Sequence, residues 1–330
     1  MLNGVALTKP SAKVRKGDRL TWVRDAMREA PGSVEPEAIE LTIYHEDDDC
    51  IALEKPAGMS VHPAGGLRSG TLVNALLHHC ACGAVLPAAS AAEGGREGDS
   101  DGSEDELGDG GGAAHELAAG DMFGSADGFA GESIVRPGIV HRLDRGTSGV
   151  MVVAKHQGAH AALMAQFAAR STHRTYLALV WGVPQPRAGT VVTGIGRDPG
   201  DRLRMAALPE GRGKRAVTHY TVVEELDGGH VSLVRFKLET GRTHQIRVHS
   251  RHLGHPLLGD AVYGGAQVVH GPRTPARVAL FERLLGAEGV VSRPALHAET
   301  LEFDHPSTRA RMSFQSALPQ DFATAASMLR

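Results

Sequence analysis

A long segment with little capacity to fold divides this chain and determines where its core must come from. Residues 84–133 consist mainly of Gly, Ala, Ser and acidic residues, with no sustained helical or strand period. Such a composition cannot bury enough apolar surface to offset the entropy lost on ordering. We therefore expect a disordered insertion on the surface and a core built from the two flanking parts. A regulatory or partner-binding role of the insertion is less expected than an insertion that the fold simply tolerates.

The insertion also masks the charge of the part expected to fold. The 330-residue chain has a net charge of -3. Residues 87–133 hold twelve acidic residues and one base, Arg96, and without them 34 Lys and Arg face 26 Asp and Glu. The remainder is therefore basic, as expected of a protein that binds nucleic acid.

Two other features narrow the class of protein. No run of about 18 apolar residues is present, so no segment is expected to span a membrane, and no secretory signal opens the chain. Cys50, Cys80 and Cys82 form no CxxC pair, which argues against a disulfide framework and against a zinc site. An intracellular, reducing compartment is therefore expected.

Outside the insertion, short apolar runs alternate with turn residues. Two hairpins are predicted, from residues 41–45 and 50–53 and from residues 217–225 and 230–239. Single strands are expected at 150–154, 174–182 and 296–303. Helical spacing is present at 71–79, with Thr71 as candidate N-cap, at 159–169, and from 241 to near 254, while 268–290 is predicted to be a shorter variable segment. The absence of βαβ alternation predicts an α+β domain on a mixed or antiparallel sheet.

The first 24 residues form a separate basic piece with two turn signals. They resemble the second half of the small RNA-binding domain of ribosomal protein S-four, without the two helices that begin that domain. Either the sequence starts too late or the domain has decayed, and the first is favoured because a bare hairpin has little core. Residues 25–38 are predicted to be a linker to a main domain at 39–330.

One short stretch of the main domain carries a candidate reactive group. Asp144 lies between Arg142 and Arg145 and is followed by a Thr-Ser-Gly turn and an apolar run. A carboxylate in this setting can be held ionised and directed into a cleft, although a surface salt bridge would have the same local sequence. Other segments of the chain are needed to distinguish a carboxylate in a cleft from a surface salt bridge.

Five further segments accompany His141-Arg142-Leu143-Asp144-Arg145-Gly146-Thr147-Ser148-Gly149. They are Lys55-Pro56-Ala57-Gly58, Arg174-Thr175-Tyr176, Glu239-Thr240-Gly241-Arg242-Thr243-His244-Gln245-Ile246-Arg247, Gly259-Asp260-Ala261-Val262-Tyr263-Gly264 and Arg293-Pro294-Ala295-Leu296-His297-Ala298. Together they resemble the RluA-type pseudouridine synthases over roughly residues 40–83 and 134–326.

The resemblance implies a pseudouridine synthase fold: an α+β domain with a mostly antiparallel mixed sheet, flanking helices and a catalytic cleft across the sheet. The family converts a uridine in RNA to pseudouridine by breaking the N-glycosidic bond, turning the base and rejoining it through carbon five. Nothing is oxidised and no atoms are lost, so no cofactor and no metal are expected. The implied partner is a structured RNA with a flipped uridine, bound by a monomer.

Three catalytic residues follow from the resemblance. Asp144 acts on the nucleotide as nucleophile or as base, two alternatives that stay open. Arg247 is the cationic partner that keeps this carboxylate ionised in the cleft. Tyr176 stacks on the uracil and assists removal of the proton from carbon five. The family usually has Lys two residues before this tyrosine, where this chain has Arg174.

The resemblance also assigns substrate-binding residues. Arg142 enters the RNA stack when the uridine leaves it, and Leu296 packs under the tyrosine and the base. His141, Arg242 and His244 are predicted to bind the substrate, and His244 and His249 are expected to contact RNA or backbone. Asp260 is interpreted only as structural support.

Several alternatives stay open. A metal hydrolase could use His244, His249, His252 and His255, but the last three fall at intervals of three, which drift around a helix instead of converging. A non-catalytic RNA-binding protein on the same fold is a second alternative. Large-subunit ribosomal RNA is favoured over transfer RNA as substrate. The compartment is cytoplasmic or, if the N-terminus is incomplete, chloroplast or mitochondrion.

Overall fold

The computed structural model describes residues 17, 19, 34–63, 67–80, 138–201, 204–209, 211–264, 274–286 and 289–330. The chain divides into two units, residues 1–34 and 35–330. Apart from Gly17 and Arg19, the predicted RNA-binding piece at 1–24 lies outside the described residues, as does the acidic insertion at 84–133. Both therefore stay predictions, and the structure concerns the main domain.

In the described part of the main domain, eleven strands form one sheet. They are β1 (Thr42–Glu46), β2 (Cys50–Lys55), β3 (Gly138–Ile139), β4 (Ser148–Ala154), β5 (His173–Trp181), β6 (Ala188–Arg197), β7 (Met205–Leu208), β8 (Lys214–Leu226), β9 (Val231–Leu238), β10 (Leu296–Asp304) and β11 (Arg311–Gln315). Their order is β1-β2-β4-β10-β5-β9-β8-β6-β7, with β3 beside β4 and β11 beside β10. Only β4 and β10 run parallel. The predicted α+β fold with a mostly antiparallel mixed sheet is confirmed.

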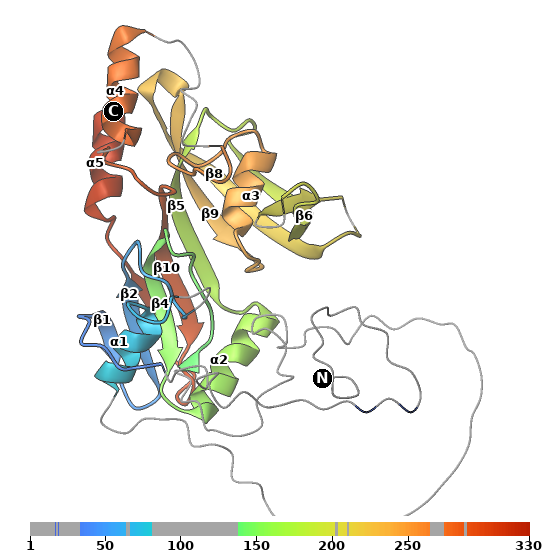
Figure 1. The fold of residues 1–330 in the computed structure, drawn as a ribbon, viewed down its shortest axis with the longest axis vertical. Coiled ribbons are helices and arrows are strands. Elements are labelled where there is room, and N and C mark those ends of the chain that lie inside the picture. The colour runs from blue at the N-terminus through green and yellow to red at the C-terminus, as the bar shows by residue number, and fades with distance from the viewer. Residues whose placement is uncertain are drawn as a thin grey trace, which may run out of the picture. The chain divides into compact units, whose positions relative to one another are not determined.

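Five helices accompany the sheet in the described residues. They are α1 (Leu72–His79), α2 (Gln157–Ala169), α3 (Gln245–His252), α4 (Pro275–Leu285) and α5 (Gln320–Leu329). None of these helices is long and apolar enough to cross a membrane. Helix α2 contacts β4 and β10, and α3 contacts β7 and β8. Figure 1 shows α4 and α5 together on one side of the sheet, near β5 and β9.

The predicted hairpins and strands are present, with shifts of a few residues at their ends. The first hairpin is β1–β2, and the second is β8–β9 across a short helical turn at Asp227–Gly229. Helix α1 begins where predicted, because the Thr71 side chain accepts the N–H of Asn74 and Asn74 in turn caps Thr71. These elements are set by their own turn and cap residues.

The helix predicted from residue 241 begins only at Gln245. The side-chain oxygen of Gln245 accepts the Arg242 N–H at 3.0 Å and the Thr240 hydroxyl at 2.8 Å. His244, just before the helix, has a φ of 56° in the left-handed region. A helix cannot extend backwards through that conformation, so the preceding residues form a turn that projects into the site.

Some elements escaped prediction. Helix α4 lies inside the segment at 268–290 that was predicted to be variable, although Thr274 at its N-cap and Pro275 at its first position are helix-start signals. Helix α5 buries Phe322, Ala325 and Leu329, which recur at helical spacing. Strands β6, β7 and β11 were also missed.

The two faces of β5 have different roles. Leu177, Leu179 and Trp181 pack into a core formed with α4 and α5. Because side chains alternate along a strand, Tyr176 lies on the opposite face. One face of this strand therefore holds the domain together, and the other face is directed to the predicted site.

The start of β4 depends on a close approach to β10. Gly149 pairs with Ala298 and has a φ of 119°, and a Cβ added there would lie 2.1 Å from the Ala298 carbonyl oxygen. Only glycine fits this position. The parallel contact thereby determines where β4 begins, and hence where the turn that carries Asp144 lies.

Candidate active site

Asp144 lies in the turn that precedes β4, and the turn is attached to two distant segments. Arg145 donates from Nε to the Gly58 carbonyl at 2.9 Å, on the loop after β2. Arg293, just before β10, donates to the Gly146 carbonyl at 2.9 Å. The three strands β2, β4 and β10 are neighbours in the sheet, so the sheet order places the carboxylate.

Lys55, at the end of β2, is a further residue beneath this turn. Its side chain is fully buried and donates to the carbonyls of Pro56, Met59 and Arg145 at 2.7, 2.9 and 3.4 Å. Burial, with a smaller contribution from Arg293, lowers its pKa to about 7. The sequence contains this lysine in a matched segment, but nothing local indicates that it supports the turn.

Asp144 and Arg247 meet, as predicted. Arg247 Nη1 donates to Asp144 Oδ2 at 3.3 Å. The other side of the guanidinium is bound by Asp260, with Nε to Oδ2 at 2.7 Å and Nη2 to Oδ1 at 3.0 Å. Burial opposes the charge of Arg247, but its bonds to Asp260 and Asp144 prevail and raise its pKa. Asp260 therefore orients the partner of Asp144, which is more than the general support predicted for it.

The two oxygens of the Asp144 carboxylate differ. Oδ2 accepts the hydrogen bond of Arg247, whereas Oδ1 has no hydrogen-bond partner among the described residues. The side chain is 21% exposed, so one oxygen is held and the other is open to an incoming molecule. This arrangement suits a group that reacts while it stays ionised.

His244 borders the same carboxylate from the turn before α3. Its Nε2 lies 3.9 Å from Asp144 Oδ2, and its Nδ1 lies 3.0 Å from the hydroxyl of Tyr263. That hydroxyl also accepts the Met205 N–H at 3.1 Å, so Tyr263 links the neutral ring of His244 to β7. Burial lowers the pKa of His244, which favours this neutral form.

Tyr176 and Leu296 occupy one face of adjacent strands. Tyr176 pairs with Ala298 and Ala178 pairs with Leu296, so the two side chains are diagonal neighbours. Burial raises the pKa of the Tyr176 hydroxyl, Arg174 opposes this rise, and the charge of Asp144 adds to it. Asp144 is therefore close enough to act on Tyr176 electrostatically, although no hydrogen bond joins Tyr176 to either catalytic candidate in the described part of the chain.

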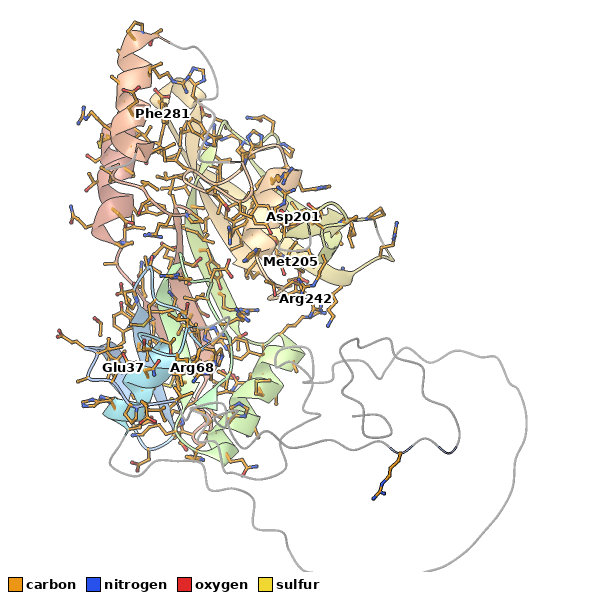
Figure 2. All side chains as sticks on the ribbon, in the orientation of Figure 1. Glu37, Arg68, Asp201, Met205, Arg242 and Phe281 are labelled. Atoms are coloured by element: carbon orange, nitrogen blue, oxygen red, sulfur yellow. The ribbon has the colours of Figure 1, made fainter. Side chains whose placement is uncertain are left out.

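The predicted arginines are accessible. Arg142 is exposed, as a residue that enters RNA would have to be. Arg242 is half-buried and donates from Nε to the Arg215 carbonyl at 3.2 Å. Figure 2 shows Arg242 on the side of the β8–β9 region that is nearer to α2. Burial lowers the pKa of Arg242, and the charge of Arg170, just after α2, lowers it further.

His141 is placed differently from its predicted role. Its ring is buried, stacks on Phe167 with centroids 4.8 Å apart, and accepts the Val152 N–H on Nε2 at 3.1 Å. Burial lowers its pKa to about 3, so the ring stays neutral. These contacts argue against binding of RNA by His141 and indicate a structural role. The side chain of His141 is buried, whereas that of the next residue, Arg142, is exposed.

The histidines after Arg247 do not converge on one point. His249 binds the hydroxyls of Thr193 and Thr218 through its two ring nitrogens, at 3.0 and 2.8 Å. The Nδ1 of His255 lies 2.7 Å from the Trp181 carbonyl oxygen. His249 and His255 thus each have a protein partner of their own, which argues against the metal hydrolase alternative.

A different cluster does bring metal-ligand atoms together. His45, Asp47, Cys50 and His305 place one ligand atom each within 4.8 Å of one another. However, the backbone N–H groups of residues 307–308 donate to His305 Nδ1, so its Nε2 carries a proton, which points at Asp47 Oδ2 at 2.7 Å. Burial, together with nearby acids, raises the pKa of the Cys50 thiol to about 12. The cluster is therefore a hydrogen-bonded tie between the β1–β2 turn and the end of β10.

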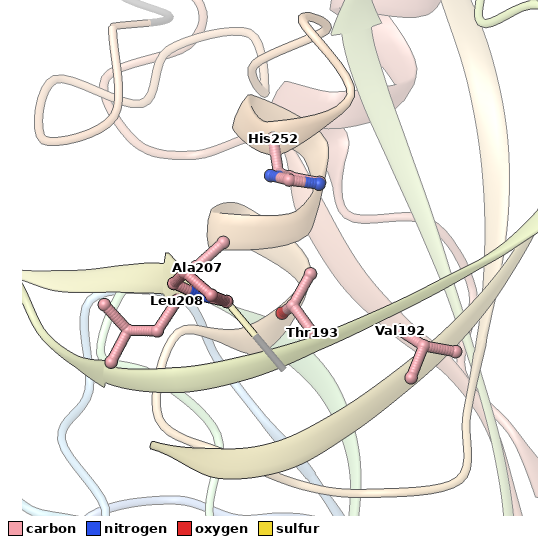
Figure 3. A pocket seen from close by; sticks show the side chains of 6 residues that line it. Val192, Thr193, Ala207, Leu208 and His252 are labelled. Atoms are coloured by element: carbon pink, nitrogen blue, oxygen red, sulfur yellow. The ribbon is translucent and has the colours of Figure 1, made fainter. Parts of the chain in front are cut away.

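A pocket between β6, β7 and α3 lies apart from these residues (Figure 3). It is lined by Val192, Thr193, Ala207, Leu208, Pro209 and His252. None of the predicted site residues lines it.

Comparison with known proteins agrees with this geometry. Residues 49–252 match the family model described as RNA pseudouridylate synthase. The chain is 40% identical to RNA pseudouridine synthase 2, chloroplastic, of Oryza sativa subsp. japonica, over 98% of this chain and 71% of the relative. It is 38% identical to ribosomal large subunit pseudouridine synthase D of Zymomonas mobilis, over 99% of this chain and 84% of the relative.

A solved structure supports the fold. Human RNA Pseudouridylate Synthase Domain Containing 4 matches with a TM-score of 0.54 at 24% identity, over 87% of this chain and 92% of that one. The mixed, mostly antiparallel sheet agrees with this class of fold, and the family match gives its chemistry. The chain belongs to the RNA pseudouridylate synthase family, and it is an RNA pseudouridine synthase, an isomerase.

Proposed function

We propose that this protein converts a uridine of large-subunit ribosomal RNA to pseudouridine, with Asp144 as the residue that acts on the nucleotide. The observation that carries the assignment is the asymmetry of the carboxylate. Arg247 binds one oxygen at 3.3 Å, and the other oxygen is unpartnered among the described residues and accessible. An ionised, oriented and open carboxylate is what the reaction requires of the protein.

The reaction exchanges one bond to the sugar for another. The bond from N1 of uracil to C1′ breaks, a bond from C5 to C1′ forms, C5 loses a proton and N1 gains one. Atoms and electrons balance within the nucleotide, so no cofactor is needed. Asp144 Oδ1 serves as nucleophile or as base, and the geometry suits both roles.

The other predicted residues surround the base. Tyr176 and Leu296 share one face of neighbouring strands and provide an apolar support for the uracil ring. Arg142 is exposed two residues before Asp144, where it takes the place of the flipped uridine in the RNA stack. Arg242 and His244 bind the RNA beside the site. We propose that the protein acts on RNA as a monomer.

The choice of substrate and compartment rests on relatives. The name of the Zymomonas mobilis relative specifies the large ribosomal subunit, and the name of the rice relative specifies the chloroplast. Large-subunit ribosomal RNA in an organelle, the chloroplast first, is therefore the proposed target. Residues 39–330 are proposed as the catalytic domain, with residues 1–24 as an accessory RNA-binding piece.

Site-resolved pseudouridine mapping of total RNA, with and without the gene, tests the proposal. We expect the loss of pseudouridine at a site in large-subunit ribosomal RNA, restored by the wild-type gene and by Arg330→Gln but not by Asp144→Ala. Arg330 is a suitable control because it is an exposed arginine paired with Glu224. A lost site in transfer RNA alone would contradict the substrate, and restoration by Asp144→Ala would contradict the catalytic assignment. No lost site at all would contradict the function in that cell type.

A further inference from the structure

One buried arginine among the described residues has no anionic partner. Arg174, on β5 two residues before Tyr176, is 8% exposed. Its guanidinium makes no hydrogen bond or ion pair with a described residue, and its Nε is buried without a partner. The only contact of this group with a ring places Cζ 5.3 Å from the centre of Phe167.

The other buried arginines of the described chain are paired. Arg247, 7% exposed, binds Asp260 at 2.7 Å, and Arg277, 8% exposed, binds Asp227 at 2.6 Å. A buried charge without a counterion is costly, and burial accordingly lowers the pKa of Arg174. This cost is tolerated if an incoming anion supplies the missing partner.

The surroundings of Arg174 also favour an anion. The hydroxyl of Thr172, two residues earlier, is buried and has no hydrogen-bond partner among the residues that the structure describes. Thr172 lines a surface pocket together with Arg170, His173, His219, Lys237, Leu238 and Glu239. The one acid in this lining, Glu239, lies 2.7 Å from His219, and the two cations Arg170 and Lys237 outnumber it.

Gly241, which has no side chain, leaves room for the guanidinium of Arg174. A Cβ added to Gly241 would lie 2.9 Å from Arg174 Nη1, so the guanidinium lies against the backbone just before Arg242. Arg242 in turn is near Arg170. Arg174 therefore lies against the turn that carries Arg242, and the charge of Arg170 at the end of α2 acts on Arg242.

We propose that Arg174, with the Thr172 hydroxyl, binds a backbone phosphate of the RNA next to the uridine that enters the site. The proposal rests on the proposed function, because it takes RNA as the ligand. A guanidinium fork matches two phosphate oxygens, and the hydroxyl can donate to a third. Arg174 lies about 7 Å along the strand from Tyr176, so one nucleotide can contact both residues.

The test compares wild-type protein, Arg174→Gln and the control Arg330→Gln. Binding is measured at several salt concentrations with a synthetic stem-loop of the mapped ribosomal RNA site and with poly(U). For Arg174→Gln we expect about tenfold weaker binding. The slope of log affinity against log salt should become shallower by about 0.7 to 1. Arg330→Gln should keep the wild-type slope, and Arg174→Lys should keep most of it.

Thermal stability distinguishes binding from packing. Because Arg174 lacks a partner in the free protein, Arg174→Gln should keep or raise the Tm. A Tm lowered by several degrees with an unchanged salt slope would show that Arg174 serves only to pack on Phe167, and would overturn the proposal.

A second experiment identifies which phosphate of the RNA Arg174 binds. Single neutral methylphosphonate linkages are introduced along the stem-loop, and one of them should weaken binding to the wild type but not to Arg174→Gln. Equal losses in both proteins at every linkage would also overturn the proposal. These binding measurements need no turnover, so wild-type protein that binds RNA without forming pseudouridine would refute the proposed function alone.

Discussion

Both carboxylate oxygens of Asp260 accept hydrogen bonds from Arg247, at 2.7 and 3.0 Å. Oδ1 of the same carboxylate also accepts the backbone N–H groups of Val262 and Tyr263. The pair occupies Nε and Nη2 of the guanidinium and leaves Nη1 directed at Asp144. Asp260, which does not touch Asp144, therefore determines the direction from which Asp144 is bound.

Asp260→Asn should impair both folding and the reaction. Removing one partner of a buried ion pair lowers the free energy of unfolding by about 3 to 5 kcal/mol. Loss of orientation at Arg247 should lower kcat about 100-fold in single-turnover assays of pseudouridine formation. Asp227→Asn breaks the comparable Arg277 pair away from the site, so it should lower stability in urea and leave kcat near the wild-type value. Wild-type kcat in Asp260→Asn would contradict the positioning role.

Gly149→Ala should prevent the parallel contact between β4 and β10. The new Cβ would lie 2.1 Å from the Ala298 carbonyl oxygen, so we expect a loss of more than about 4 kcal/mol of unfolding free energy. Gly211→Ala is the matched control, because Gly211 has a φ of 82° and nothing within 4 Å of an added Cβ. Its cost should be only about 1 to 2 kcal/mol, from the left-handed backbone alone. Equal losses in urea denaturation would show that the contact is unimportant.

Lys55 should make stability rise with pH. Its folded-state pKa of about 7 is below the ordinary value of 10.5, so between these values the unfolded chain binds more protons than the folded one. The free energy of unfolding therefore increases as pH rises above 7, by up to about 1.4 kcal/mol per pH unit. Lys55→Met loses this dependence as well as three hydrogen bonds. Urea titrations from pH 6 to pH 9 should diverge for the two proteins, and parallel curves would count against the lowered pKa.

His141 should make stability fall in acid. Its folded-state pKa of about 3 is below the ordinary 6.5, so between these values the unfolded chain binds the extra proton. Stability is therefore lost as pH falls below 6.5, by up to about 1.4 kcal/mol per unit. His141→Gln keeps an acceptor for the Val152 N–H without titrating, so its stability should depend less on pH between 6 and 4. An identical acid dependence in both proteins would refute this assignment.

Local signals in the sequence were sufficient for much of the fold. Turn residues at Asp227–Gly229 predicted the β8–β9 hairpin, and the side chain of Thr71 predicted the start of α1, because these interactions are complete within a few residues. Helix α4 carried comparable signals at Thr274 and Pro275 that were overlooked. Strand β6 was not predicted, because its glycines interrupt the apolar pattern.

For the candidate site, the sequence predicted some contacts and missed others. The motif around Asp144 indicated the family and predicted the contact with Arg247, which the structure contains. The same contiguous motif placed His141 in the substrate-binding group, because a motif does not say which of its side chains point into the core. Lys55 was visible only as a motif residue, and its three carbonyl partners lie on two different loops.

By itself, the sequence determined the hairpins, most helices and the family, and it predicted the reactive carboxylate, because these depend on neighbouring residues or on motif chemistry. Only the tertiary structure decided which oxygen of Asp144 is held, that Asp260 orients Arg247, and that Arg174 is buried without a counterion. These properties arise where separate strands and turns are brought together by sheet order and register, as for Asp144 and Arg247, which lie 103 residues apart. Burial and pairing of a charge are relations between such segments, so no single stretch of the chain contains them.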